Sequence, residues 1–492
     1  MKFAEGKSSK IKNSLKGEME MKINFKRTAA LALVGILAVS CFAGCGKGSD
    51  KDEQGRTIIE VGGYPVKEGV AMDNFDAKIE TFMKDNPDVN VKGNTYGFSV
   101  DTFFSKAAGG QLPNIFTTAY TEVQTCVGSG YVKDITEIGK KYGYDETTIN
   151  PRLIDGNVLA KDGVLYAIPN YTYALGLAFN GNLFEQAGLV DENGDYMIPK
   201  TWDEVAQFSV QIKEKTGKAG FITGSIARIG GWLFTPIAWS YGVEFMKKDK
   251  DGKWIATFDS QEMVNALKFY YDLKWKYDVL PADIALMDNT MAPQKLAAGE
   301  AAMLLRAPDY FDQLSNMGVD LKDFGLMPLP AGPKRHVTLL GGTSIMISEN
   351  STDDQVDAAM RWIEISSNHK LTDAIKANMI KNYETRKAEN RGIGVLELSN
   401  WAEDTEVVKW EREYELENAN LDLKKVAAYN DFSTGKDYKD LEIQPEEPMC
   451  AQELYAIVDK LVQEVFTNKN VDIAKIVKEA NKDFQQNYLD YV

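Results

Sequence analysis

Residues 165–180, LYAIPNYTYALGLAFN, are the stretch that decides the fold, because they form a long run of residues that favour β-strands. Pro169 lies inside this run, and a segment so long and extended can pass from one β-sheet into another. Residues 336–348 have the same extended character and contain the pair Gly341-Gly342. We therefore expect two crossings between sheets, one near residue 170 and one near residue 340.

Strand-like and helix-like segments alternate before the first crossing. Residues 57–61 and 114–118 are short apolar strand candidates, and Phe75, Ile79 and Phe82 stand at helical spacing between them. This alternation indicates an α/β protein with a mostly parallel sheet that helices cover on both faces. Ligands of such sheets bind beyond the carboxyl ends of the strands, so we look for the site in the loops there.

The helical pattern continues beyond the first crossing. Thr201 predicts a helix start, with Glu204 three positions later as in a capping box. Apolar stripes in residues 454–465 and 473–480 indicate two helices that pack into the core. Residues 402–447 are charged and poor in aliphatic side chains, which is typical of a solvated helical excursion or a long loop.

Composition and charge limit the function. The chain has 492 residues, with 56 Lys and Arg against 72 Asp and Glu, and a net charge of −16. Such an acidic protein is not expected to bind the phosphate backbone of nucleic acid. The chain has two histidines, His336 and His369, and it contains no D-x-D-x-D-G loop. We therefore expect no metal site and no cofactor.

The amino-terminal residues 21–50 carry the pattern of a secretion signal. A short basic region is followed by the uncharged run 28–40, which is too short to span a bilayer comfortably but suits the hydrophobic region of a signal peptide. Residues 42–45, FAGC, then resemble a bacterial lipobox, with Phe42 where the motif usually has leucine. The resemblance implies cleavage before Cys45 and a lipid such as palmitate on its thiol. A plain secreted signal peptide and an uncleaved anchor helix are the alternatives.

This processing defines the expected mature chain. Residues 1–44 are expected to be the signal peptide, with Met21 as the more natural start and residues 1–20 as an over-extended gene model, and residues 45–55 the lipidated cysteine and its linker. Without residues 1–44 the chain keeps 48 basic and 69 acidic side chains, a net charge of −21. Because no later segment is apolar enough to span a bilayer, we expect the lipid alone to hold the protein on the extracellular face of the cell membrane. Cys41 is a weaker competing site for the lipid.

Two further cysteines, Cys126 and Cys450, remain in the mature chain. An extracellular location permits a disulfide between them. We expect two unpaired, buried thiols instead.

Six short motifs together resemble the extracellular solute-binding proteins of ABC importers, in the large family that binds sugars and oligosaccharides. Each is weak alone, but they occur in the family's order behind the lipobox and cover residues 56–490, with no landmark in residues 385–445. The motifs are GVLYAIP at 163–169, FNGNLFEQAGL at 179–189, PKTWDE at 199–204, AAGEAAM at 297–303, MPLPAGP at 327–333 and GGTS at 341–344.

The resemblance implies a two-lobed fold of the type II periplasmic-binding-protein class, in which hinge crossings join two α/β lobes and a ligand is held in the cleft between them. Lobe 1 would comprise residues 56–169 and 343–395, and lobe 2 residues 172–338 and 400–492. On this reading a monomer binds a mono- or oligosaccharide, closes because only the closed state engages both lobes, and is presented to the permease subunits of an ABC transporter. The lipid anchor would raise its effective concentration beside the permease.

A sugar cleft needs flat aromatic rings for the apolar faces of the sugar and polar side chains for its hydroxyls. Strand alternation puts Tyr171 and Tyr173 on one face of the first crossing. In the family a loop near Trp232 supplies a stacking ring, and the loop after residues 302–305 carries further contacts; Trp239 is expected in the core. The predicted ligand contacts are Tyr64, Thr118, Tyr120, Tyr171, Tyr173, Arg228, Trp232, Arg306, Asp309, Gly342 and Thr343. The alternative for the tyrosines is packing within a lobe, and for Arg306 and Asp309 a mutual salt bridge.

Two other functions stay open on the sequence. An anchored glycoside hydrolase would need two carboxylates that flank one bond. Pairs such as Asp203-Glu204 and Asp353-Asp354 are explained by their positions at helix starts, and the chain has no nucleophile elbow, phosphate-binding loop, dinucleotide fingerprint or H-E-x-x-H motif. We therefore expect a binding protein rather than an enzyme. A sugar-sensing module on the same fold, without a role in transport, is the second alternative.

Overall fold

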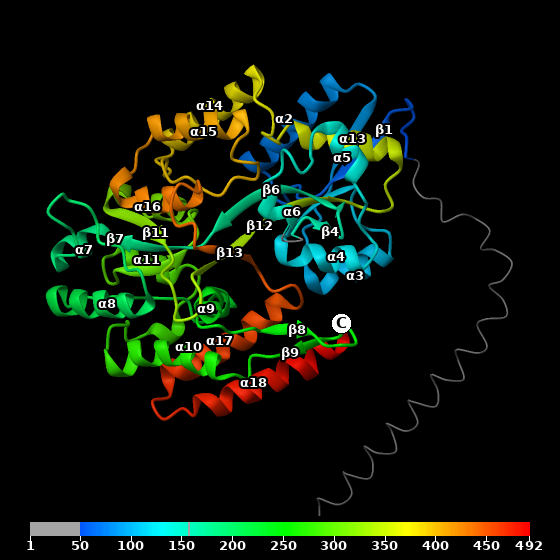
Figure 1. Cartoon of the computed structure of the whole chain (residues 1–492). Helices are drawn as coiled ribbons and strands as arrows, with labels where there is room; N and C mark the ends of the chain where they lie inside the picture. The colour runs from blue at the N-terminus through cyan, green and yellow to red at the C-terminus, as the bar shows by residue number, and fades with distance from the viewer. Residues whose placement is uncertain (1–49, 156–157) are drawn as a thin grey trace, which may run out of the picture. The chain divides into compact units, whose positions relative to one another are not determined.

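The computed structural model describes residues 50–155 and 158–492 (Figure 1). The chain divides into two compact units, Met1–Gly55 and Arg56–Val492. The described part of the first unit, residues 50–55, contains a turn in which the Gly55 amide donates to the carbonyl oxygen of Asp52 at 2.9 Å. The predicted signal peptide and Cys45 lie outside the described residues. Every element named below belongs to the second unit.

The second unit is a mixed α/β structure, as the sequence predicted. Its strands are β1 (Thr57–Val61), β2 (Val89–Gly93), β3 (Ile115–Ala119), β4 (Ala160–Lys161), β5 (Val164–Leu165), β6 (Ala167–Ala174), β7 (Gly176–Asn180), β8 (Met246–Lys248), β9 (Trp254–Ala256), β10 (Met303–Arg306), β11 (Phe324–Pro328), β12 (Val337–Ile347) and β13 (Glu442–Pro445). Its α-helices are α2 (Val70–Asp85), α3 (Val100–Ala108), α4 (Val123–Gly128), α5 (Thr136–Tyr142), α6 (Pro151–Asp155), α7 (Gly181–Ala187), α8 (Trp202–Thr216), α9 (Ile229–Ser240), α10 (Gln261–Tyr271), α11 (Met291–Ala297), α12 (Tyr310–Asn316), α13 (Asp353–Glu364), α14 (Asp373–Ala388), α15 (Glu406–Glu417), α16 (Leu423–Ser433), α17 (Ala451–Thr467) and α18 (Ile473–Asn487). Short 3-10 turns lie at Tyr120–Glu122, Ile284–Leu286, Leu321–Asp323 and Leu489–Tyr491, and a π-helical turn lies at Asp272–Lys276.

The larger sheet has the strand order β13-β12-β3-β1-β2, and β6 also pairs with β12. β1 runs parallel to β2 and β3, and β12 runs parallel to β13. β12 runs antiparallel to β3 and β6. The prediction of a mostly parallel sheet is therefore wrong in part, because β12 re-enters the larger sheet after the chain has visited the smaller one and so runs against β3 and β6.

The first predicted crossing is present. β6 belongs to the larger sheet, and β7 is the middle strand of a smaller antiparallel sheet with the order β10-β7-β11. Leu175 alone separates the two strands. Its amide donates to the carbonyl oxygen of Leu339 at 3.1 Å, and its carbonyl oxygen accepts from the Thr338 hydroxyl at 2.7 Å. The second crossing follows β11, where the chain returns to the larger sheet as β12.

Local sequence signals explain where the helices begin and what they bury. The Thr201 hydroxyl accepts from the Glu204 amide at 3.2 Å and so caps α8 as predicted. The stripe along α17 is buried, including Val458, Val462 and Val465, and α17 packs against α9, α10 and α18. Burial of one apolar face of an amphipathic helix is the main source of its stability.

Residues 402–447 differ from the sequence expectation. They form α15, α16 and β13, and α16 packs against β11 instead of standing in solvent. Tyr429 is fully buried, and its hydroxyl donates to the carbonyl oxygen of Ala174 at the crossing, at 2.6 Å. A few buried residues, rather than a continuous aliphatic stripe, attach this region to the core.

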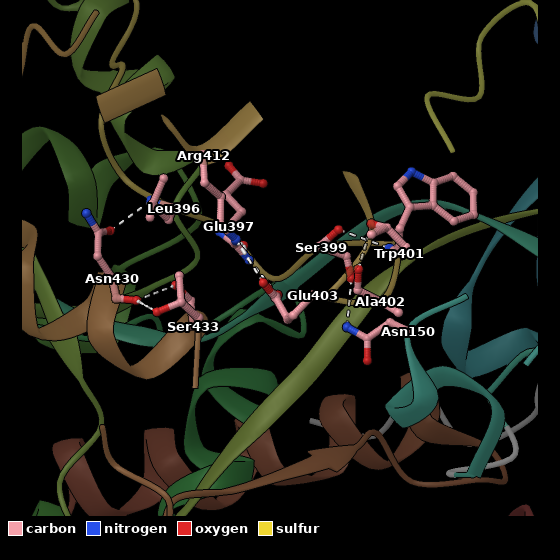
Figure 2. Close-up of polar contacts among 12 residues, drawn as sticks. Asn150, Leu396, Glu397, Ser399, Trp401, Ala402, Glu403, Arg412, Asn430 and Ser433 are labelled. Atoms are coloured by element: carbon pink, nitrogen blue, oxygen red, sulfur yellow. Dashed lines mark hydrogen bonds and ion pairs between the residues drawn. The ribbon is translucent and has the colours of Figure 1, made fainter. Parts of the chain in front are cut away.

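Residues 396–403, the segment that leads into α15, are held by polar contacts with Asn430, Asn150 and Arg412 (Figure 2). The Leu396 amide donates to the Asn430 side chain at 2.8 Å, and the Asn150 side-chain amide donates to the carbonyl oxygen of Ser399 at 2.8 Å. Arg412 forms an ion pair with Glu403, with the closest N–O distance 2.5 Å. Behind this segment lies a small cavity of about 240 Å³. Its charged lining residues are Arg386, Glu397, Glu411, Arg412 and Glu415.

The two described cysteines are unpaired, as expected. Cys126 is buried, whereas Cys450 is only half-buried. Within residues 50–155 and 158–492, no helix combines the length and the apolar character that crossing a membrane requires.

Candidate functional site

A cavity of about 440 Å³ lies where segments from both sheets converge. Its walls come from the end of β3, from β6 and β12, from the start of α9, from the loop after β10, and from residues near the start of α17. Figure 1 shows β6 and β12 running side by side between these parts. Six of the predicted ligand contacts line this cavity: Tyr173, Arg228, Trp232, Arg306, Asp309 and Gly342.

Aromatic rings form one wall of this cavity. Tyr173 and Trp232 meet edge to face, with ring centroids 6.3 Å apart. Tyr455, which the sequence did not single out, lines the same cavity. Rings in this arrangement offer flat apolar surface beside polar edges, which suits a ligand with both kinds of surface.

The start of α9 is built to hold Trp232. Ala227 and Arg228 have left-handed backbone conformations, with φ of 58° and 70°. The Asp459 carboxylate on α17 accepts from the backbone amides of Arg228 and Gly231, the latter at 2.7 Å. A Cβ at Gly231 would lie 2.2 Å from the carbonyl oxygen of Tyr455, so only glycine allows the two helices to approach so closely. The GGW sequence thus fixes the Trp232 ring at the cavity.

Arg306 forms the polar floor of the cavity with two amide side chains. It is only 4% exposed, and its guanidinium donates to the backbone carbonyl of Asn289 at 2.6 Å and to the Gln313 side chain at 3.1 Å, with a further bond to the Asn289 side chain. Burial lowers the pKa of Arg306 to about 10, although the charges of Asp309 and Asp288 oppose this shift.

Asp309 lies three residues after Arg306, in the loop after β10, and it is an exposed residue that lines the cavity. Its pKa is raised because surrounding protein displaces water, and Arg306 partly offsets this. Among the described residues the two groups form no direct ion pair, so the alternative of a mutual salt bridge is not found.

A carboxyl group that the sequence did not predict also lines the cavity. Glu446 follows β13 and accepts from the Tyr455 hydroxyl at 2.8 Å. Burial raises its pKa to about 7. Its neighbour Glu447 accepts from the indole nitrogen of Trp239 at 2.8 Å, which confirms Trp239 as a core residue. No local pattern in the charged stretch before α17 indicates that either glutamate enters the interior.

Gly341 and Gly342 leave room for two rings. A Cβ on Gly341 would lie 2.4 Å from the Tyr173 ring, and a Cβ on Gly342 would lie 2.4 Å from the Tyr120 ring and 2.2 Å from the carbonyl oxygen of Tyr171. Any side chain at these positions would therefore displace the crossing strands or the rings. The glycine pair is required by close packing beside the cavity.

The other predicted contacts lie outside this cavity. The Tyr120 hydroxyl is 2.6 Å from that of Thr172, and Tyr120 lines a neighbouring cavity. Tyr171 lines the small cavity beside α15, although its ring is only 5.5 Å from that of Tyr173. Thr118 is buried in β3 opposite Ser344.

The remaining two predicted contacts, Thr343 and Tyr64, are also engaged elsewhere. Thr343 accepts from the Asn170 side chain at 3.0 Å. Tyr64 donates from its hydroxyl to Asp76 at 3.1 Å, and its ring packs against Phe75. Neither residue lines the cavity that holds Trp232.

The charges of the cavity are balanced. Its lining includes two guanidinium groups, Arg228 and Arg306, two carboxyl groups, Asp309 and Glu446, and three amide side chains, Asn289, Gln313 and Gln452. Such a lining can donate to and accept from hydroxyl groups without requiring a charged ligand. Within the part of the chain that the structure describes, no group of three or more His, Cys, Asp or Glu side chains is placed to hold a metal ion.

Comparison with known proteins agrees with this architecture. A family model described as bacterial extracellular solute-binding protein matches residues 68–367. The sn-glycerol-3-phosphate-binding periplasmic protein UgpB of Salmonella typhimurium is 23% identical over 310 residues, which cover 60% of this chain and 68% of that protein. Maltose-bound MalE3 of T. maritima superposes with a TM-score of 0.60 at 19% identity, covering 88% of this chain and 99% of that one.

A further solved structure, the substrate-binding protein Lmo0181 of Listeria monocytogenes in complex with cycloalternan, has a TM-score of 0.60 at 17% identity and covers 88% of this chain and 99% of that one. At these identities the likeness to solved structures shows the fold, which is that of two-lobed periplasmic sugar-binding proteins. The family model covers more than half of the chain. The chain therefore belongs to the bacterial extracellular solute-binding protein family.

Proposed function

We propose that this protein binds a neutral carbohydrate in the cavity around Trp232 and delivers it to the permease of an ABC transporter. The observation that carries the proposal is the joining, in one cavity, of the Tyr173–Trp232 ring pair with the Arg306 amide cluster. Rings pack on the apolar faces of a sugar, and fixed donors and acceptors orient its hydroxyls. Relatives that bind maltose or cycloalternan support the same class of ligand.

A phosphorylated ligand, as in the relative UgpB, is the alternative that Arg228 and Arg306 raise. We favour a neutral ligand because both terminal nitrogens of the Arg306 guanidinium are already engaged by Asn289 and Gln313. Asp309 also adds negative charge to the same lining, and Glu446 adds more as it ionises around pH 7, which would oppose a phosphate.

The experiment is calorimetric titration of the purified protein with a panel of neutral mono- and oligosaccharides and with sn-glycerol 3-phosphate. We expect saturable heat with at least one sugar, no response to the phosphate, and no newly released reducing ends. Saturable heat with the phosphate alone would refute a carbohydrate ligand. Release of reducing ends would indicate the glycoside hydrolase instead, with Asp309 and Glu446 as the carboxyl groups to test.

We propose that the ligand is held by closure of two lobes, residues 56–169 with 343–395 and residues 172–338 with 400–492. Two separate sheets, connected by β6–β7 and by the return from β11 to β12, support this division. If both lobes contact the ligand only in the closed state, that state binds the ligand more tightly than the open state does. The ligand would then favour closure by the difference in binding free energy between the two states.

We also propose that a lipid on Cys45 holds the protein on the extracellular face of the membrane. The full chain, produced in a bacterium, is expected to partition into the detergent phase of Triton X-114. The Cys45→Ala variant is expected to move to the aqueous phase, and Cys41→Ala serves as the matched control that stays with the detergent. Loss of partitioning in Cys41→Ala alone would assign the lipid to the other cysteine.

A further inference from the structure

The small cavity of about 240 Å³ beside α15, here called the α15 cavity, has no part in the functions described above. Its walls come from residues 168–172 of β6, residues 366–368 after α13, the segment 395–401, α14 and α15. The α15 cavity shares no lining residue with the cavity around Trp232. It is therefore a separate place at which a ligand could bind.

Three carboxyl groups line the α15 cavity without a cation paired to them. Glu397 comes from the segment 395–401, and Glu411 and Glu415 come from successive turns of α15. Within residues 50–155 and 158–492, none of the three forms an ion pair with a basic side chain. Charged groups withdrawn from water are normally paired, because desolvation of an unpaired charge is costly. The protein itself supplies no such partner here.

Both arginines of the lining are engaged by other groups. Arg412 forms an ion pair with Glu403, with the closest N–O distance 2.5 Å (Figure 2). Arg386 donates to the carbonyl oxygen of Gly392 at 2.6 Å, and its carboxylate partner is Asp312 at 3.9 Å. The charges of these arginines act on the three carboxyl groups only at longer range, and the lining contains no lysine.

Tyrosine hydroxyls and aromatic rings complete the lining. The Tyr171 hydroxyl is buried, and no group of the described residues lies in hydrogen-bonding geometry with it. The Tyr383 hydroxyl donates to Glu415 at 3.0 Å, and Trp401 adds a third ring. A buried hydroxyl without a partner carries a desolvation cost, which a bound group could remove. Carboxylates beside aromatic faces are the surroundings that an organic ammonium ion prefers.

We propose that the α15 cavity binds a small organic cation with one or two ammonium groups, which Glu397, Glu411 and Glu415 hold. A single water molecule occupies roughly 30 Å³ of liquid, so about 240 Å³ has room for a molecule with several non-hydrogen atoms. A metal ion fits less well, because nowhere in the described residues are three His, Cys, Asp or Glu side chains placed to coordinate one. A short diamine has both the charge and the size that this lining accepts.

Proton release should accompany this binding. Burial, together with the charge of Glu415, raises the pKa of Glu397 to about 8 and that of Glu411 to about 7. A bound cation favours the ionised carboxylates, so its affinity should increase between about pH 5.5 and about pH 7.5, where aliphatic amines stay charged. Residues 366–368 add only neutral side chains to the lining. The other charged and titratable groups that face the glutamates are Tyr171 on β6, Asp309 after β10, Arg386 and Tyr383 on α14, and Arg412 on α15.

The test is calorimetric titration of the purified protein, without sugar, with the diamine putrescine near pH 7.5. Butanediol, which has the same carbon chain but no charge, is the control ligand. We expect saturable heat with putrescine alone, weaker binding near pH 5.5, and proton release when the titration is repeated in buffers of different ionisation enthalpy. Glu397→Gln and Glu411→Gln should each weaken the affinity at least tenfold. Glu406→Gln, at an exposed position at the start of α15, is the matched control and should keep it.

Three outcomes would overturn the inference. One is the absence of saturable heat with putrescine at either pH. Another is an unchanged affinity in both glutamine variants, which would show that the amine associates with the acidic surface elsewhere. The third is saturation by calcium chloride but not by putrescine, which would indicate a metal site. Because no sugar is present, each of these results leaves the proposed carbohydrate function untouched.

A further variant keeps the test decisive if neither glutamine variant folds. Tyr171→Phe removes only the buried hydroxyl that lacks a partner and leaves the three carboxyl groups in place. We expect it to weaken putrescine binding at least threefold. An unchanged affinity in Tyr171→Phe would then overturn the inference.

Discussion

At the scale of the residue, Trp232 is the side chain on which binding is expected to depend most. Its ring is half-buried, so its surface is available to a ligand, and the Asp459 contacts hold the backbone beneath it. Its position therefore depends on α17, which lies far along the chain, as much as on its own helix.

We expect Trp232→Ala to weaken sugar affinity at least tenfold, or about 1.4 kcal/mol, because the stacking surface is lost. The melting temperature should change little. Trp410→Ala is the matched control, since the Trp410 ring is also half-buried but stacks on Tyr414 and lines neither cavity. Calorimetry measures both affinities, and an unchanged affinity in Trp232→Ala would contradict this role.

Tyr171 and Tyr173 lie on the same strand but line different cavities. The sequence placed Tyr171 and Tyr173 on one face of β6, but only Tyr173 lines the cavity around Trp232. The pairing of β6 with β12 is regular from Tyr171 to Tyr173, and the two rings lie 5.5 Å apart, so alternation holds there. The two rings line different cavities because each cavity adjoins a different stretch of the strand.

At the scale of the element, the segment before α15 and the helix itself bring three carboxyl groups to one small cavity. The pKa of Glu397 is raised to about 8 and that of Glu411 to about 7, in both cases because burial excludes water and because the charge of Glu415 lies nearby. The pKa of Glu415 is raised by burial as well. Ionisation of this cluster is therefore less favourable in the folded protein than in the unfolded chain.

The consequence is a contribution to stability that falls as the pH rises. Between about pH 4.5, where an unfolded glutamate ionises, and about pH 8, this cluster binds more protons in the folded state than in the unfolded state, so its contribution to the free energy of unfolding decreases with pH. We expect Glu397→Gln to flatten this decline. The variant should match the wild type near pH 5 and exceed it by about 1 kcal/mol near pH 8.

Scanning calorimetry of the ligand-free protein at several pH values measures this difference. Glu406→Gln, at an exposed position at the start of α15, is the matched control and should keep the slope of the wild type. A Glu397→Gln variant that is less stable than the wild type at pH 8 would show that the carboxylate is instead stabilising there.

At the scale of the whole molecule, the proposed closure has a measurable consequence. We expect a saturating sugar to reduce the radius of gyration in small-angle X-ray scattering, because the ligand would favour the state in which both lobes engage it. At a free sugar concentration one hundred times the dissociation constant, binding should also stabilise the protein by about 2.7 kcal/mol. The Trp232→Ala variant at the same sugar concentration is the control and should respond less. Sugar binding without any change in radius would contradict closure.

Much of the fold was predictable because its signals are local. Hydrophobic spacing predicted the first strands and helices, Thr201 predicted the start of α8, and the long β-rich stretch predicted the passage from β6 into β7. The family motifs, the crossing strands and the aromatic cluster around Trp232 predicted six of the residues that line the candidate cavity. These signals involve residues that are close in sequence, so propensity and periodicity are sufficient to reveal them.

Only the tertiary structure decided which distant groups complete the cavity. Asp459 holds the start of α9 across 231 residues, and Glu447 meets Trp239 across 208. The tertiary structure likewise decided that β12 runs antiparallel to β3, that one face of α16 is buried against β11, and that Glu446 lines two cavities. The physical reason is that these features arise from packing between elements that are remote in the chain. A charged stretch such as residues 402–447 carries no local pattern from which such packing could be predicted.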